Sequence, residues 1–330
     1  MALSDPTPLN SLCIGVDENG LGSRLGPLVT SAVMAEVSEP GLPRLTRKAR
    51  GQLGSDLDDS KRLLKHGSIA LGEAWARAVV ERLSPTPAGC PDDVVRCLAL
   101  ETQAALRAPC PPSVERQCWG TDHEVFVAPD ALVDRVRKHL DKLERDGIRV
   151  VGAKSSIVCT QQLNAAKAQG VNRFVRNLHS MERLVVALHQ AARERSGGAQ
   201  AEIVAVCGKV GGIADYSRFF GPLGGHLHAV LACERARSAY RFPGLGELHF
   251  VQDADSKHRL VMLASMLGKY LRELLMARIT HFYIGQATAP LHECSGYSDP
   301  VTGQFVLSTQ ALRKKLSVPS VCFERVGAGG

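Results

Sequence analysis

Apolar positions along the chain follow two patterns, and their order predicts an α/β protein. Short apolar runs typical of buried strands cover residues 12–16, 28–37, 147–160, 201–206, 226–233 and 248–252. Apolar residues at helical spacing cover about 68–83, 94–106, 129–146, 171–195 and 257–279, and a polar loop leads to a last helix in the C-terminal tail. Because strands alternate with helices, the pattern favours a layered α/β domain.

The most distinctive stretch is the first predicted hairpin, residues 12–37. Its first strand ends on two adjacent acids, Asp17 and Glu18, and a glycine turn, Gly20-Leu21-Gly22, follows. Two carboxylates at the mouth of a buried strand are costly unless a cation binds them. A Gly-x-Gly turn lets the backbone approach a ligand closely, because no Cβ stands in the way. A hairpin whose turn happens to be acidic is the alternative interpretation.

A second acidic group, Asp253 and Asp255, precedes the long helix predicted at 257–279. An acid there is most simply a helix cap. If Asp255 lies near Asp17 and Glu18, however, acids from separate elements meet at one edge of the sheet. That arrangement is what a two-metal phosphoryl-transfer site needs, with two divalent ions roughly 4 Å apart. Magnesium prefers oxygen ligands, which carboxylates supply.

Residues 84–146 differ from the rest of the chain in their many prolines and four cysteines. We expect a loop-rich, partly helical insertion there, within a main domain made of residues 1–83 and 147–330. The cysteines follow the spacing C-x6-C-x12-C-x7-C, which lacks the short pairs of a zinc module.

Composition sets only broad limits. No apolar stretch approaches the roughly 18 residues that a membrane span needs, and the N-terminus lacks the pattern of an export signal. We therefore expect a cytoplasmic protein with reduced cysteines. The net charge of +7 permits a nucleic-acid partner without requiring one, and aromatic residues are sparse at 5%. The oligomeric state does not follow from the sequence.

Five stretches in this order resemble the type 2 ribonucleases H. They are VDENGLG (16–22), LDDSKRL (57–63), VCGKVGGIADY (206–216), the acid-then-helix run 254–276, and SGYSDPVT (295–302). Each is weak alone, and the ordered set is specific. The resemblance implies a ribonuclease H-like mixed sheet flanked by helices, with a C-terminal helical portion.

The resemblance also implies a metal site. Asp17, Glu18 and Asp255 match three of the family's four metal-binding acids, whereas Cys207 stands at the position of the remaining one. A thiol is a poor magnesium ligand, and Cys207 is equally understood as a buried packing residue. Asp215 is a nearby acid that could replace the missing ligand.

Further matches imply substrate contacts. The Gly20-Leu21-Gly22 turn matches the backbone that reads a ribose 2′-hydroxyl, Ser60 and Lys61 match a phosphate-contacting segment, and Tyr297 matches a tyrosine that stacks on the sugar. Lys269 and Arg272 match basic positions on the long helix. Simpler interpretations are a helix start at Ser60, a loop turn at Tyr297 and a solvated helix face.

Together these matches imply a Mg²⁺- or Mn²⁺-dependent endoribonuclease acting on RNA in RNA–DNA hybrids or on embedded ribonucleotides. The alternative is a degenerate, catalytically inactive member that binds duplex nucleic acid or a protein partner. Retention of three acids favours the enzyme, and the residues Leu21 and Cys207 favour the inactive member.

Overall fold

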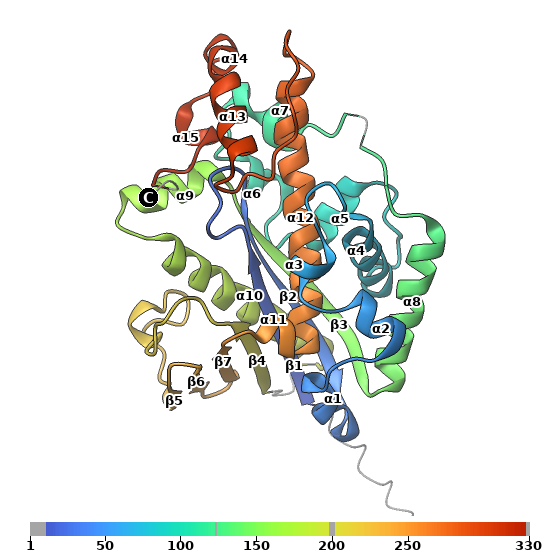
Figure 1. The fold of residues 1–330 in the computed structure, drawn as a ribbon. Coiled ribbons are helices and arrows are strands. Elements are labelled where there is room, and N and C mark those ends of the chain that lie inside the picture. Colours follow the sequence, from blue (N-terminus) through green and yellow to red (C-terminus); the bar gives the residue numbers. More distant parts are fainter. Residues whose placement is uncertain (1–10, 123, 198–201, 328–330) are drawn as a thin grey trace, which may run out of the picture.

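The computed structural model describes residues 11–122, 124–197 and 202–327, and its centre is a seven-stranded mixed sheet (Figure 1). The strand order is β3-β2-β1-β4-β7-β6-β5. The strands are β1 (Ser11–Asn19), β2 (Leu28–Val37), β3 (Ile148–Val158), β4 (Ile203–Gly208), β5 (Ala229–Cys233), β6 (Arg237–Phe242) and β7 (Gly246–Val251). Strands β1, β4 and β7 are parallel, and the other neighbours pair antiparallel. The predicted α/β class, a mixed sheet flanked by helices, is confirmed.

Helices cover both faces of this sheet. On one face, α12 (Arg259–Ile284) packs with α4 (Ala70–Leu83) and α8 (Asp130–Arg145) in the largest hydrophobic cluster. On the other face, α10 (Arg173–Arg195) packs against β1, β2 and β4, and their apolar side chains form a second cluster that extends to β6 and β7. The central strands are therefore buried on both sides, which is why they appear as short continuous apolar runs in the sequence.

The long helix α12 lies unusually close to β1. A Cβ at Gly15 would come 2.2 Å from the backbone carbon of Leu260, and one at Gly268 would come 2.9 Å from Ser31 Oγ. Glycine at both positions lets the helix backbone rest directly on the strands. This contact fixes the segment just before α12 beside the carboxyl end of β1.

The segment 84–146 forms four helices, and their apolar side chains join the core of α4 and α12. The helices are α5 (Pro91–Leu98), α6 (Gln103–Arg107), α7 (Pro112–Trp119) and α8. The single helix predicted at 94–106 is wrong, because the chain turns at Ala99 and the Leu100 N–H donates to Ser155 O of β3 (2.8 Å). Thr102 then caps α6.

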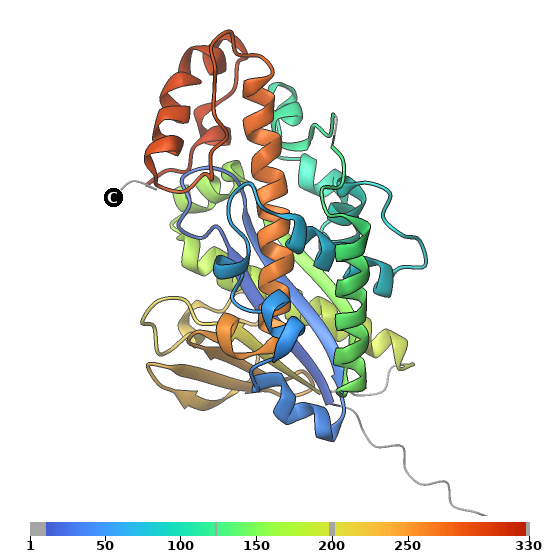
Figure 2. The ribbon, with the colours of Figure 1, turned by 45° about the vertical axis from the view of Figure 1, so that its right-hand side comes forward.

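The C-terminal helices α13 (Pro300–Ser308), α14 (Gln310–Lys315) and α15 (Ser320–Phe323) pack around Tyr283 at the far end of α12 (Figure 2). The remaining helices are α1 (Leu42–Thr46), α2 (Gly51–Asp56), α3 (Ser60–Leu63), α9 (Thr160–Ala168) and α11 (Ala254–Lys257), with 3₁₀ turns at Glu39–Gly41 and Ser217–Phe219.

Within the described ranges, none of the helices has the length and apolar character of a membrane span. Residues 1–10, where no export signal is expected, lie outside those ranges.

Candidate active site

Asp17 and Glu18 lie inside β1 rather than after it. The sequence predicts that the strand ends at Val16, but it continues to Asn19 because β2 pairs with it throughout, Asp17 opposite Ser31 and Glu18 opposite Thr30. The two acids are thus held by a regular antiparallel ladder, and their backbone is not a loose turn.

Asp255 comes to the same place from α11, between β7 and α12. Asp17, Glu18 and Asp255 line one cavity, which we call the acid cavity. Its other lining residues are Asn19, Gly20, Leu21, Gly22, Lys61, Gly208, Lys209, Asp253, Ala254, Lys269 and Tyr297. The fold therefore brings together three acids that are up to 238 positions apart in the sequence.

Burial dominates the electrostatics of these acids. Asp17 is only 7% exposed, and burial, with the negative charge of Asp255, raises its pKa to about 7, although Ser265 and Lys61 act in the opposite direction. Burial and the neighbouring Asp17 also raise the pKa of Glu18 well above its usual value. Buried carboxylates with raised pKa values are typical of functional sites.

The positive charge of Lys61 acts on all three of these acids. Lys61 Nζ lies 3.1 Å from Asp255 Oδ2. Burial lowers the pKa of this ammonium, but the charges of Asp255, Asp59 and Asp17 raise it by more.

The donor chemistry of the acid cavity suits a hard divalent cation, because its acids offer only oxygen ligands and Asp17 and Glu18 lack a cation of their own. In the chain as far as the structure describes it, no three His, Cys, Asp or Glu side chains already converge closely enough to hold a metal ion.

The position facing these acids on β4 is Gly208, not Cys207. Cys207 is 0% exposed and lies in the cluster on the opposite face of the sheet, beside Val16. A Cβ at Gly208 would come 2.9 Å from Asp17 Oδ1 and 3.7 Å from Glu18 Oε2. Because side chains alternate along the strand, Cys207 points into this apolar cluster and does not line the acid cavity, although burial and the charge of Glu18 raise the pKa of its thiol.

Asp215 does not replace the missing acid. Its carboxylate accepts hydrogen bonds from Ser217 and Tyr240 and pairs with Arg218, at the turn after β4. These bonds lower its pKa, with the Ser217 hydroxyl as the main cause.

The glycine turn borders the acid cavity and is held from two sides. Gly20 has φ of +86°, and a Cβ there would come 2.4 Å from Arg272 Nε, so only glycine fits without strain. Buried Arg325 donates from Nη1 to Gly20 O (2.6 Å) and from Nη2 to Gly26 O (2.7 Å). Sequence reasoning missed Arg325, because no motif surrounds it and only the fold brings it to the turn.

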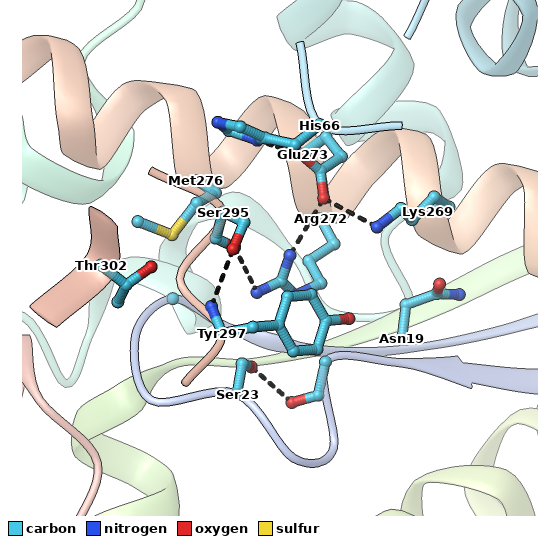
Figure 3. A network of polar contacts seen from close by, with 12 residues as sticks. Asn19, Ser23, His66, Lys269, Arg272, Glu273, Met276, Ser295, Tyr297 and Thr302 are labelled. Carbon is cyan, nitrogen blue, oxygen red and sulfur yellow. Dashed lines mark hydrogen bonds and ion pairs between the residues drawn. The ribbon is translucent and has the colours of Figure 1, made fainter. Parts of the chain in front are cut away.

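Tyr297 lies over the same turn in a dense polar network (Figure 3). The Arg272 guanidinium stacks 4.3 Å from the centre of its ring, and Lys269 Nζ lies 5.5 Å away. Both cations also bind Glu273, at 3.0 Å for Lys269 and 3.1 Å for Arg272. Lys269 and Tyr297 line the acid cavity. Arg272 is fully buried, so it affects the cavity only by positioning Tyr297 and Glu273, which it contacts.

Ser60 and Lys61, which the resemblance matched to a phosphate-contacting segment, lie in different surroundings. Ser60 is 1% exposed, and its Oγ lies 2.8 Å from Ser265 Oγ, so it joins α3 to α12 and does not face the cavity. Lys61 faces the cavity. Lys209, which the sequence reasoning did not single out, also lines it, and its Nζ donates to Ser238 Oγ (2.6 Å). The sequence did offer a signal for Lys209: it directly follows β4, the strand that pairs with β1, and β1 carries Asp17 and Glu18.

Comparisons with known proteins give fold-level likeness at low identity. No protein-family model matches the chain, and no curated protein sequence matches it. It is similar to the structure of the PCNA:RNase HII complex from Archaeoglobus fulgidus (15% identity over 96% of this chain and 94% of that one, TM-score 0.40). Ribonuclease H2 from Pyrococcus horikoshii OT3 gives 17% identity, 94% and 92% coverage and a TM-score of 0.41. Bst-RNase HIII in complex with Mn²⁺ gives 12% identity, 97% and 68% coverage and a TM-score of 0.43. These three structures are ribonucleases H of the HII and HIII types, and the likeness is one of fold.

Proposed function

We propose that the protein is a divalent-metal-dependent endoribonuclease that cleaves RNA in RNA–DNA hybrids or at embedded ribonucleotides. One observation carries the proposal: buried Asp17 and half-buried Glu18, both with raised pKa values, line a cavity together with lysines and an aromatic ring. Such a cavity offers carboxylate ligands for cations and, beside them, basic side chains for a phosphate backbone.

In this proposal Asp17, Glu18 and Asp255 hold Mg²⁺ or Mn²⁺. Bound there, the ions supply activation of water and stabilisation of the leaving oxygen. Lys61 then exchanges its contact with Asp255 for a phosphate, which its exposed side chain can reach. Because Asp17 and Glu18 must lose their protons to bind metal, activity rises with pH through about 7.

Substrate discrimination is assigned to the glycine turn and Tyr297. The backbone of Gly20, Leu21 and Gly22 would meet the ribose 2′-hydroxyl, the group that distinguishes RNA from DNA. Tyr297 would stack on the sugar, and Lys269 would contact phosphate. The same proposal includes a reducing, cytoplasmic setting, in keeping with ten free thiols.

A second candidate function is binding of hybrid or duplex nucleic acid, or of a protein partner, without cleavage. The observation that favours it is Gly208, which leaves the position facing Asp17 without a carboxylate. With three acids and a lysine in place, electrostatic binding could persist while metal affinity is weak.

The test is cleavage of three end-labelled duplexes: an RNA–DNA hybrid, a DNA duplex with one ribonucleotide, and an all-DNA duplex. We expect cleavage of the first two, stronger in Mn²⁺ than in Mg²⁺ and absent with chelator. Asp17→Asn should lower the rate at least about a hundredfold. Asp215→Asn, which removes an acid outside the acid cavity, is the matched control and should retain activity.

Binding separates the two candidates. Salt-dependent hybrid binding without cleavage in either metal would support the binding-only function. Absence of both binding and cleavage would reject the two together.

A further inference from the structure

Four of the ten cysteines gather in one region outside the acid cavity. Cys118 and Cys159 line a small apolar cavity with Trp119, and Cys110 and Cys322 line an open pocket with Pro109 and Pro111. They come from the loop before α7, from α7, from the start of α9 and from α15. No disulfide links any of them.

Two of these thiols, Cys110 and Cys118, lie close enough for a thiol–thiol hydrogen bond, through which each shifts the pKa of the other. Trp119 Nε1–H also donates to Cys110 Sγ, at 3.3 Å, and Gln117 Nε2 donates to Cys118 Sγ, at 3.5 Å. Cys110 thus receives two donors, an arrangement that stabilises a thiolate.

The chemistry of the two sulfurs differs accordingly. The hydrogen bond from Cys118 and, to a smaller extent, that from Trp119 lower the pKa of Cys110 to about 6. The same contact and burial raise the pKa of Cys118 well above its usual value. A thiolate is the nucleophilic form of cysteine, and Cys110 is half-buried in a pocket that a small oxidant can enter. A reactive thiolate beside a second thiol is typical of redox-sensitive pairs.

We propose that Cys110 and Cys118 form a peroxide-sensitive pair that hydrogen peroxide converts to a disulfide. The Cys110 thiolate sulfur attacks one peroxide oxygen, the O–O bond breaks, and the hydroxide that leaves takes up a proton as water. Cys118 then attacks the sulfur of the Cys110 sulfenic acid, and the S–O bond breaks as the S–S bond forms. The hydroxyl leaves with the Cys118 proton as a second water, so two thiols are oxidised and one peroxide is reduced.

Peptide mapping of the full-length protein tests this directly. The reduced protein is treated with hydrogen peroxide, free thiols are alkylated, and trypsin is added. Trypsin cuts after Arg107, Arg116 and Arg135, so the disulfide joins the peptides 108–116 and 117–135. We expect this linked pair after peroxide and its disappearance after dithiothreitol. A disulfide between any other two cysteines, or none, would overturn the proposal.

Reactivity gives a second readout that needs no disulfide. At pH 7, Cys110 should react with iodoacetamide at least about tenfold faster than Cys97, an exposed thiol of the same segment. Equal rates at the two positions would contradict the proposal. In Cys118→Ser, peroxide should leave Cys110 as a sulfenic acid that dimedone traps, whereas Cys110→Ser should give no dimedone adduct at Cys118. Because the peptide map uses the unmodified chain, the test stands even if a serine variant folds poorly.

Discussion

The carboxylate of Glu273 and those of Asp17 and Glu18 in the acid cavity differ in their supply of cations. Glu273, with a side chain 2% exposed, contacts Lys269, Arg272 and His66. Although its burial opposes ionisation, the charge of Lys269, the His66 bond and Arg272 lower its pKa. Asp17 is buried too and Glu18 is half-buried, yet they share the charge of Lys61 with Asp255, and desolvation raises their pKa values.

The difference teaches that burial alone does not decide whether an acid is structural or functional. Glu273 is satisfied within the fold, and it holds the cations that stack on Tyr297 (Figure 3). The acids of β1 remain short of positive charge, so an external cation gains more there than anywhere around Glu273. The predictions below test this contrast in order of expected effect.

The largest effect is expected from Glu273→Gln, which removes the carboxylate that neutralises two buried cations. The free energy of unfolding should fall by about 3–5 kcal/mol, because Lys269 and Arg272 lose their partner. Glu273 has a lowered pKa, so its contribution is fully present above about pH 4.5 and is lost as the pH falls through its folded pKa. Urea unfolding at pH 7 and at decreasing acidic pH measures this. An unchanged midpoint at pH 7 would contradict the contrast.

A somewhat smaller loss is expected from Cys207→Asp, which adds a carboxylate to the core without a cation. Stability should fall by about 2–4 kcal/mol at neutral pH, with no gain in Mn²⁺ affinity, because position 207 faces the opposite side of the sheet from Asp17. Cys207→Ala is the control for lost packing. Calorimetric titration with Mn²⁺ and thermal unfolding give the two readouts, and tighter Mn²⁺ binding would show that the facing position has been misassigned.

Asp17→Asn should have the opposite sign and stabilise the metal-free protein. Between pH 3.8 and about 7 the folded state binds a proton at Asp17 that the unfolded chain has released, so the wild type loses stability as the pH rises across this window. Asparagine does not titrate, so the gain should be absent near pH 3.8 and reach on the order of 2 kcal/mol above pH 7. Unfolding with chelator present checks it. A loss of stability at pH 8 would mean that Asp17 is already satisfied by the protein.

The smallest effect on stability is expected from Lys61→Met. Its side chain is largely exposed, so the ion pair with Asp255 should contribute less than about 1 kcal/mol. The same change should weaken hybrid binding and reduce the slope of log affinity against log salt by about 1, since one phosphate contact is lost. Arg149→Met, which removes an exposed ion pair with Glu36 outside the acid cavity, is the control. An unchanged salt slope would remove Lys61 from the binding surface.

Hydrophobic pattern predicted the longer elements well. Strand β2 spans the predicted 28–37, α10 runs from Arg173 to Arg195 within the predicted helix, and α12 lies where the long helix was expected. Each of these elements carries a long apolar stripe or run, and such a pattern can be recognised without knowing which element packs against it. Elements whose ends depend on a neighbour were less predictable. Strand β6 is set by its pairing with β5 and β7, and the break at Ala99 is set by a bridge to β3, which no local pattern encodes.

The sequence by itself determined the α/β class and the identity of Asp17, Glu18 and Asp255 as notable acids, because their types and their neighbours are local properties. Tertiary structure decided that the three line one cavity, since only the packing of α12 on β1 through Gly15 and Gly268 brings α11 to the end of the strand. It also decided that Gly208 rather than Cys207 faces them. The face that a residue presents depends on strand register, and register is fixed by pairing with β1 across the sheet.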